Sequence, residues 1–120
     1  MNTEFWKNKK VFITGHTGFK GGWLSLWLSK MGAEVKGYSL LPDKPESFFS
    51  STNLSSILDS QIGDIRDEKK LYESCKNHEV FINLACISND TSFALDEKLS
   101  TSINLDAFEP MVIAAKKSWN

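Results

Sequence analysis

The sequence predicts an α/β fold built on a doubly wound parallel sheet, with helices on both faces of the sheet. Two features predict it: short apolar runs alternate with segments whose apolar residues recur at helical spacing, and a glycine-rich turn follows the first run. We identify strands in four places along the 120 residues, whereas a complete sheet of this type has about six strands. The sheet is therefore expected to be truncated after about four strands.

The first third of the chain predicts a strand–helix–strand unit. Residues 9–14 are a short apolar run bounded by charge and glycine, which is typical of a buried parallel strand. Residues 23–31 carry apolar side chains at positions 24, 27, 28 and 31, and Gly32 is placed to end that helix. Residues 33–38 predict the second strand.

The middle of the chain is more polar. Residues 42–60 are rich in Ser, Pro, Asp and Asn and predict a surface excursion with one short helix. Residues 61–64 predict a short third strand. Asp67 is placed to cap a helix that runs through Leu71 and Cys75.

The last third predicts a strand, a loop and a helix. Residues 80–85, VFINLA, read as the fourth strand, and residues 88–100 as a polar loop. Residues 104–117 have apolar side chains at positions 105, 108, 112 and 115, which predicts a helix with that face in the core. Because the chain stops on this helix without a capping glycine, we expect an incomplete domain.

Composition narrows the function classes. The net charge of −1 offers no electrostatic surface for nucleic acid or for an anionic membrane. The N-terminus has no signal-peptide pattern and no run is long enough to span a membrane, so we expect a soluble cytoplasmic protein. Cys75 and Cys86 fit neither a disulfide framework nor a metal site, and we expect both thiols to be buried.

The motif that carries chemistry is the glycine-rich turn. Gly15, Gly18 and Gly21 have the spacing GxxGxxG between a predicted strand and a predicted helix. In that context the first glycine allows a sharp turn, the second lets the backbone approach a pyrophosphate, and the third lets the helix pack on the sheet. A mononucleotide phosphate loop fits poorly, because it needs Gly-Lys-Ser/Thr where this chain has Lys20-Gly21-Gly22. The turn therefore predicts a Rossmann-type dinucleotide site.

These residues resemble a known family. The stretch TGHTGFKGGWLSLWLSKMGAEVKGYSL is similar to the opening of the CDP-glucose 4,6-dehydratases, within the extended short-chain dehydrogenase/reductases. The resemblance runs over about residues 5–67, and it continues at the end of the fourth strand, where Asn83-Leu84-Ala85 is similar to a segment beneath the nicotinamide half of the cofactor. In that family an acidic residue and the following backbone meet the adenine, which here implies Asp64 and Ile65. The cofactor-binding residues that motif and resemblance together predict are Gly15, Thr17, Gly18, Phe19, Gly21, Ser39, Asp64, Ile65, Asn83, Leu84, Ala85 and Asn104.

The resemblance implies an NAD-dependent 4,6-dehydratase acting on a nucleotide sugar, with the chain as its N-terminal, cofactor-binding part. From about Phe81 onward the sequence is more similar to nucleotide-sugar epimerases of the same superfamily, so an epimerase or reductase stays open. A third alternative is a non-catalytic NAD-binding fragment. NADP also stays open, because Ser39 stands where an acidic residue would favour NAD and no arginine stands nearby for a 2′-phosphate. A homodimer is a further open alternative.

No catalytic residue and no metal ligand is predicted. Tyr72 and Lys76 have the Tyr-x-x-x-Lys spacing of the superfamily's catalytic pair, but they precede the fourth strand, whereas the resemblance implies a pair after the fifth. We therefore interpret Tyr72 as a partly buried helix residue and Lys76 as solvated. The catalytic region and the substrate domain are expected to be absent, and the chain alone to be inactive.

Other side chains near these motifs have two readings each. Trp23 and Trp27 are expected in the core. His16 is either near the pyrophosphate or exposed on the turn, and Lys20 faces either phosphate or solvent. The polar residues Ser88, Asn89 and Thr91 follow the fourth strand, where ligands bind in open α/β sheets, and could contact cofactor or sugar.

Overall fold

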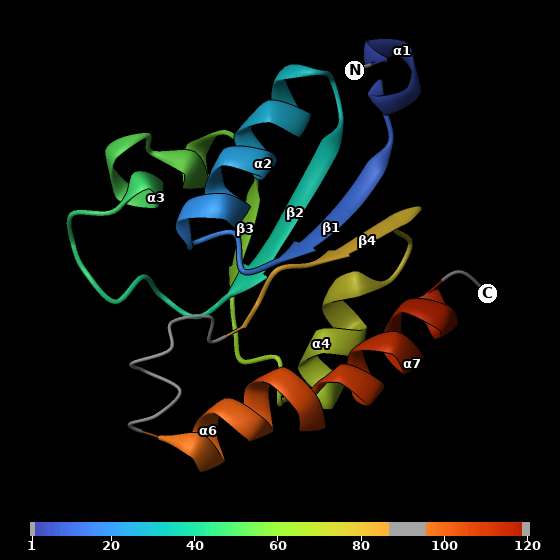
Figure 1. Cartoon of the computed structure of the whole chain (residues 1–120). Helices are drawn as coiled ribbons and strands as arrows, with labels where there is room; N and C mark the ends of the chain where they lie inside the picture. The colour runs from blue at the N-terminus through green and yellow to red at the C-terminus, as the bar shows by residue number, and fades with distance from the viewer. Residues whose placement is uncertain (1, 87–95, 119–120) are drawn as a thin grey trace.

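The computed structural model describes residues 2–86 and 96–118, and a four-stranded parallel sheet forms its centre (Figure 1). The strands lie in the order β3-β2-β1-β4. Their bounds are β1 Lys10–Thr14, β2 Glu34–Ser39, β3 Asp59–Ile62 and β4 Val80–Asn83. Neighbouring strands pair in parallel throughout, with Thr14 aligned with Tyr38 on one side and with Asn83 on the other. The predicted Rossmann-type α/β fold is confirmed.

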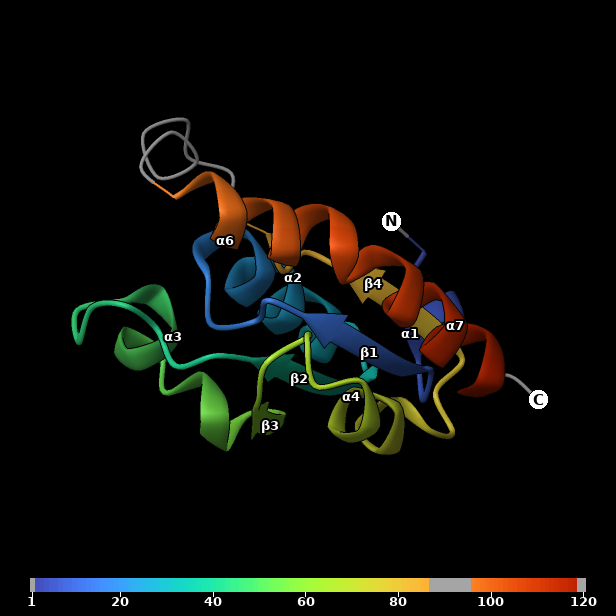
Figure 2. The ribbon, with the colours of Figure 1, turned by 90° about the horizontal axis from the view of Figure 1, so that it is seen from below.

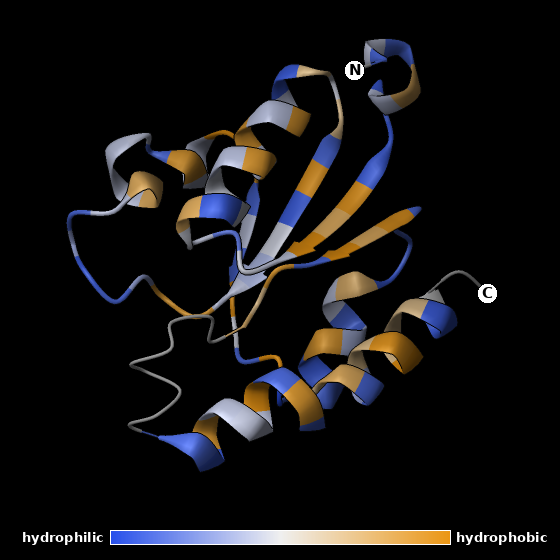
Figure 3. Ribbon diagram, viewed as in Figure 1, coloured by the Kyte–Doolittle hydropathy of each residue, from blue (hydrophilic) through white to orange (hydrophobic). Residues whose placement is uncertain are grey.

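Helices cover the two faces of the sheet, which gives three layers. In β1, Val11 and Ile13 belong to a core cluster shared with α2 (Phe19–Lys30), whereas Phe12 belongs to a second cluster on the opposite face. Helices α4 (Glu68–Cys75) and α7 (Phe108–Ser118) supply the second cluster. Figure 3 shows the apolar residues concentrated along β1 and β4, as expected for strands with helices on both sides.

Helix α2 places small residues, not tryptophans, against the sheet. Its buried residues are Gly21, Gly22, Ser25 and Leu28, whereas Trp23 and Trp27 are about half exposed. The expectation that both tryptophans are in the core is therefore wrong. Glycine and serine let the helix backbone approach the loop after β1, and this turns the tryptophans outward; the Trp23 ring instead stacks on Phe48 at 4.4 Å.

The excursion after β2 contains more structure than predicted. It forms the short helix α3 (Phe48–Ser51) and a 3₁₀ turn, η1 (Leu54–Ser56), whose Leu54 is fully buried. Strand β3 starts at Asp59, two residues before the predicted start at 61, because its register follows Lys36 of β2. Helix α4 begins as predicted, since the Asp67 side chain accepts a hydrogen bond from the Lys70 N–H.

The C-terminal helical region starts earlier than predicted. Helix α6 (Glu97–Thr101) is capped by Asp96 and continues through a π-helical turn, η2 (Ser102–Asp106), into α7. Pro110 explains this irregular turn, because it has no N–H to donate to a carbonyl four residues earlier. Residues 97–100 of the predicted loop are therefore helical, and Ser88, Asn89 and Thr91 lie outside the described residues.

The buried face of α7 also differs from the prediction. Ala107, Met111, Ala114 and Ala115 are buried. Of the predicted core positions only Ala115 is buried, while residues 105 and 108 are more than half exposed and 112 is 36% exposed. Both faces of this helix are apolar in sequence, and the alanines allow close packing against α4, where the Cys75 thiol reaches the Ala114 carbonyl.

A four-residue helix at the N-terminus, α1 (Thr3–Trp6), completes the fold, and its Trp6 packs on the α2 side of the core. Cys75 is buried as expected, but Cys86 is exposed, so the prediction for Cys86 is wrong. None of the helices in residues 2–86 and 96–118 has the length and apolar character required to cross a membrane.

Candidate functional site

A cavity of about 840 Å³ lies where the four strands end. Figures 1 and 2 show α3 and α6 on the side of the sheet toward which β1 points, and residues from both helices line this cavity. Most of the predicted cofactor-binding residues line it as well: Gly15, Thr17, Gly18, Phe19, Ser39, Asp64, Ile65, Leu84 and Ala85. The structure thus gathers residues from four separate strand ends into one space. Ligands bind at this edge in open α/β sheets.

The glycine turn forms the floor of the cavity between β1 and α2. Gly15 has φ +82°, and a Cβ there would lie 2.8 Å from the Ala85 nitrogen. At Gly21 a Cβ would lie 2.1 Å from the Gly15 carbonyl oxygen, so this glycine lets α2 pack against the turn. Gly18 is the N-cap of α2 and is open, because its nearest contact for a Cβ would be 3.4 Å away. The first N–H groups of α2 have no acceptor within the helix and can bind an anion here.

Hydroxyl groups join the turn to the end of β2. The Thr17 hydroxyl donates to the Leu40 carbonyl at 2.7 Å and lies 2.9 Å from the Ser39 hydroxyl. Thr17 is nearly fully buried and Ser39 is half-buried, and both line the cavity. The end of β2 therefore presents a serine oxygen where an acidic side chain would bind ribose hydroxyls.

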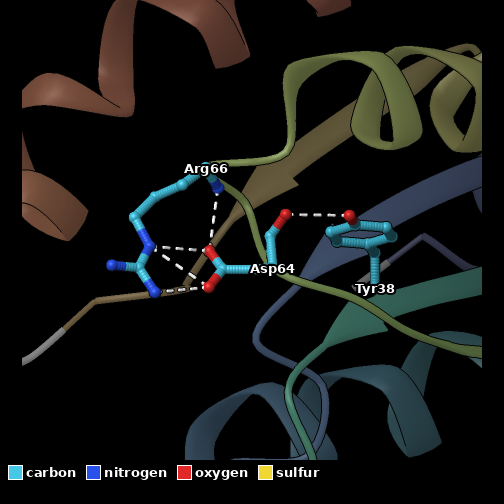
Figure 4. Close-up of polar contacts among 3 residues, drawn as sticks. All are labelled: Tyr38, Asp64 and Arg66. Carbon is cyan, nitrogen blue, oxygen red and sulfur yellow. Dashed lines mark hydrogen bonds and ion pairs between the residues drawn. The ribbon is translucent and has the colours of Figure 1, made fainter.

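The segment after β3 is held from two sides (Figure 4). From the core, the buried Tyr38 hydroxyl donates to the Asp64 carbonyl at 2.8 Å. From the surface, Arg66 binds the Asp64 carboxylate through Nε and through a second guanidinium nitrogen at 2.6 Å. Burial, together with the nearby carboxylates of Asp67 and Asp64, raises the pKa of Tyr38 to about 12. The Arg66 hydrogen bonds lower the pKa of Asp64, so a carboxylate stays charged at the cavity wall.

The end of β4 is joined to β1 through Thr14. The Thr14 hydroxyl bonds to the Asn83 side-chain oxygen and accepts from the backbone N–H groups of Leu84 and Ala85 at 3.2 Å each. Leu84 and Ala85 line the cavity, whereas Asn83 does not. Thr14 and Asn83 therefore hold the backbone of Leu84 and Ala85 in place without lining the cavity themselves.

Gly21 and Asn104 are also absent from the cavity lining among the described residues. Gly21 faces the Gly15 carbonyl, as the glycine motif predicts for its third glycine. Asn104 lies in the π-helical turn, and its neighbour Ile103 lines the cavity instead. Because a π-helical turn changes the helical period, regular spacing could not identify which of the two residues faces the cavity.

His16 behaves differently from both predicted readings. Its side chain is fully buried behind the turn, where Nε2 lies 2.6 Å from the Ser60 hydroxyl and the ring meets Phe49 edge-on. Burial lowers the pKa of His16 to about 4. The space for the ring exists because Gly37 has no Cβ, which would lie 2.2 Å from the imidazole. His16 is therefore a neutral core residue that supports the turn.

The remaining predictions concern residues away from the cavity. Tyr72 and Lys76 are both half-buried, and the Lys76 ammonium pairs with the Glu73 carboxylate at 3.0 Å. Neither residue of this Tyr-x-x-x-Lys match lines the cavity. Lys20 is exposed. Among the described residues, no cluster of His, Cys, Asp and Glu could hold a metal ion.

Several lining residues were missed by the sequence analysis. Leu40, Leu41 and Phe48 come from the excursion after β2, and Leu99 comes from α6. Leu40 and Leu41 are exposed apolar residues directly after a strand, and that combination is the signal that could have identified them. Phe48 and Leu99 depend on how distant helices fold over the sheet edge.

The chain is similar in sequence to a known enzyme. It is 54% identical over 74 residues to CDP-glucose 4,6-dehydratase from Salmonella typhimurium, a match that covers 62% of this chain and 21% of that protein. Over this stretch the chain is similar to a CDP-glucose 4,6-dehydratase. This confirms the resemblance inferred from the sequence, and the chain spans about a fifth of the length of this curated relative. No family model matches the chain.

Solved structures support the fold independently. An epimerase from Methanothermobacter thermautotrophicus superposes with a TM-score of 0.79 at 20% identity, covering 97% of this chain and 34% of that one. UDP-glucose 4-epimerase from Brucella ovis in complex with NAD gives a TM-score of 0.77 at 18% identity, covering 92% of this chain and 33% of that one. At these identities the likeness establishes the fold, and the shared part is about a third of each relative.

Proposed function

We propose that this chain binds NAD in the cavity at the strand ends. The observation that carries the proposal is the glycine turn: Gly18 is open toward the cavity at the N-terminus of α2, while Gly15 and Gly21 are enclosed by backbone. This arrangement fits a pyrophosphate, because helix N–H groups are free to bind it and no Cβ blocks its approach. The cavity volume of about 840 Å³ is in the range of cofactor sites.

The other lining residues suggest an orientation for the bound cofactor. Asp64 and Ile65 would bind the adenine, with the Asp64 carboxylate as acceptor for the exocyclic amine. Ser39 would contact the adenosine ribose. Leu84 and Ala85 would support the nicotinamide half, at the far side of the cavity from Asp64. When bound, NAD would supply hydride transfer, and these residues would hold and orient it.

The activity proposed for the parent protein is nucleotide-sugar 4,6-dehydration. The supporting observation is the 54% identity to CDP-glucose 4,6-dehydratase. In this proposal the chain supplies the N-terminal, NAD-binding part, and the acid–base residues and the sugar site come from the part of the relative that the chain does not cover. Among the described residues, Tyr72 and Lys76 lie outside the cavity lining and are not assigned to catalysis.

A nucleotide-sugar epimerase is the second candidate. The structures similar to this chain include epimerases, one of them in complex with NAD. The sequence from about residue 81 onward also resembles that branch. Both candidates use the same NAD site, so the proposal for the cofactor does not depend on the choice between them.

Calorimetric titration of the chain with NAD tests the cofactor proposal, with Gly18→Val as the decisive variant. The Gly18 backbone has φ −78° and ψ 169°, which valine adopts readily, so the variant should fold. Its side chain would fill the place of the pyrophosphate, and we expect binding to weaken by about tenfold or more, a loss of at least about 1.4 kcal/mol. Equal affinity for the two proteins would refute the proposed site.

Thiol labelling gives a second readout. Cys86 is exposed and lines the cavity, whereas Cys75 is buried on α4 and serves as an internal control. We expect NAD to slow the alkylation of Cys86 without changing that of Cys75, and to have no effect in Gly18→Val. If saturating NAD does not change the alkylation rate of Cys86, the ligand binds elsewhere.

A further inference from the structure

We infer that Thr17 and Ser39 select NAD against NADP, because Thr17 holds the Ser39 hydroxyl as a hydrogen-bond acceptor toward the cavity. The inference rests on the proposed NAD site and deepens it. It concerns the adenosine 2′ position, where the two cofactors differ. NAD has a hydroxyl at this position and NADP has a phosphate.

The evidence is the hydrogen-bond direction at the end of β2. The Leu40 carbonyl lies 2.7 Å from the Thr17 hydroxyl, and a carbonyl can only accept. A hydroxyl has one proton, so Thr17 uses its proton in this bond. Thr17 must therefore accept in its 2.9 Å bond with Ser39, and Ser39 is the donor. The Ser39 oxygen is left with lone pairs only for any other partner.

Such an oxygen distinguishes the two cofactors. A ribose hydroxyl can donate to it, whereas an ionised phosphate carries only acceptor oxygens and would meet lone pairs. Ser39 thus acts as an uncharged counterpart of the acidic residue that binds ribose hydroxyls in many dinucleotide sites.

The charges of the neighbouring loop act in the same direction. Asp43, Lys44 and Glu46 all line the cavity, so this segment carries one more negative charge than positive. A dianionic 2′-phosphate would enter a region with a net negative charge, and this disfavours its binding. The hydroxyl of NAD has no such cost.

The decisive experiment measures the dissociation constants of NAD and NADP for the wild-type chain and for Thr17→Val. Valine keeps the shape of threonine but removes the hydroxyl, so Ser39 regains a proton that it can donate to a 2′-phosphate. We expect the ratio of NAD affinity to NADP affinity to fall by about tenfold, the size of a hydrogen bond to a charged group. If Thr17 only fastened the turn to β2, both affinities would fall together, and an unchanged ratio would overturn the inference.

Further variants keep the test decisive if Thr17→Val folds poorly. Ser39→Ala removes the acceptor and should lower the affinity for NAD while leaving that for NADP. The ratio of NAD affinity to NADP affinity then falls because NAD binds less tightly. Thr17→Ser keeps the hydroxyl and should retain the wild-type ratio. Thr52→Val is the matched control, because the Thr52 hydroxyl also donates to a backbone carbonyl at 2.7 Å but does not line the cavity.

The outcomes separate the two proposals. A wild-type chain that binds neither dinucleotide would overturn the NAD site itself, and this inference with it. Binding that is lost in Gly18→Val, combined with a cofactor ratio that neither Thr17→Val nor Ser39→Ala changes, would leave the site standing and overturn only the role of the two hydroxyls.

Discussion

At the scale of single residues, the glycine turn is supported by a side chain that never reaches the cavity. His16 follows Gly15 directly, yet its ring points into the core, where it bonds to Ser60 of β3 and contacts Phe49 of α3. Its Nδ1 atom is buried and has no hydrogen-bond partner within residues 2–86 and 96–118. A proton on this ring would bring a charge into the core, so the folded chain favours the neutral form.

This environment predicts a pH-dependent stability. The pKa of His16 is about 4 in the folded chain, against 6.5 for an unperturbed histidine. Between these two values the unfolded chain binds more protons than the folded chain, so the free energy of unfolding falls as pH drops from about 6.5 to about 4. The full shift corresponds to about 3 kcal/mol. Urea unfolding across this pH range measures the effect.

His16→Gln should flatten that pH dependence, because glutamine can still bond to Ser60 but does not titrate. His78→Gln is the matched control: it removes the other histidine but retains His16, so it should keep the pH dependence that His16 causes. Parallel pH profiles for wild type and His16→Gln would show that another group is responsible.

The sequence predicted some of these residue-level features and not others. The cap formed by Asp67 was predictable, because its partner Lys70 lies three residues away on the same helix. The burial of His16 was not, because it depends on Ser60, 44 residues along the chain, and on the missing Cβ of Gly37. Local spacing identifies local contacts, whereas a tertiary contact of this kind appears only when the strands are placed side by side.

At the scale of elements, the turn between β1 and α2 contains two glycines with opposite tolerances. A Cβ at Gly21 would lie 2.1 Å from the Gly15 carbonyl oxygen, so α2 would have to move away from the turn. A Cβ at Gly18 would meet nothing nearer than 3.4 Å. Sequence spacing treats these glycines alike, but the structure gives one a packing role and the other a place at the cavity.

We therefore expect Gly21→Ala to destabilise the chain by about 2–3 kcal/mol, as overpacking does. Gly18→Ala should cost about 1 kcal/mol or less, the difference between glycine and alanine at an N-cap. Thermal unfolding followed by circular dichroism measures both. Equal losses in the two variants would contradict the separation of roles.

The elements themselves were predicted well where one periodicity dominated. The strands β1, β2 and β4 and the capped helix α4 lie within a few residues of their predicted bounds. The burial of the two tryptophans of α2 and the buried face of α7 were mispredicted, because both helices carry apolar side chains on more than one face. Leu28 and Met31 are buried as predicted. In each case small residues such as Gly22 and Ala114 decide which face packs, since they permit the closer approach.

At the scale of the whole molecule, the parallel topology explains why the predicted site residues meet. Parallel strands end at the same edge, so residues after β1, β2, β3 and β4 share one cavity although they are separated along the chain. This much follows from the alternation of strands and helices. Phe48 and Leu99 also line the cavity, but they come from α3 in the excursion after β2 and from α6. Their place at the cavity does not follow from the alternation of strands and helices, so the sequence did not predict it.

The outer face of the α6–α7 region gives the last prediction. Leu105, Phe108, Val112 and Ile113 are 67%, 57%, 36% and 43% exposed, and β4 pairs on one side only among the described strands. Exposed apolar patches and open strand edges promote association.

We expect the wild-type chain to bind the dye ANS and to sediment in a concentration-dependent manner. The double variant Leu105→Lys/Phe108→Lys should reduce ANS fluorescence by roughly half, since it removes two of the four apolar side chains. Phe5→Lys, an equally exposed aromatic on α1, should leave the signal near the wild-type level. Because none of these four α6–α7 residues lines the cavity, NAD affinity should be retained in the double variant. ANS fluorescence that the double variant does not lower would show that the apolar surface responsible lies elsewhere.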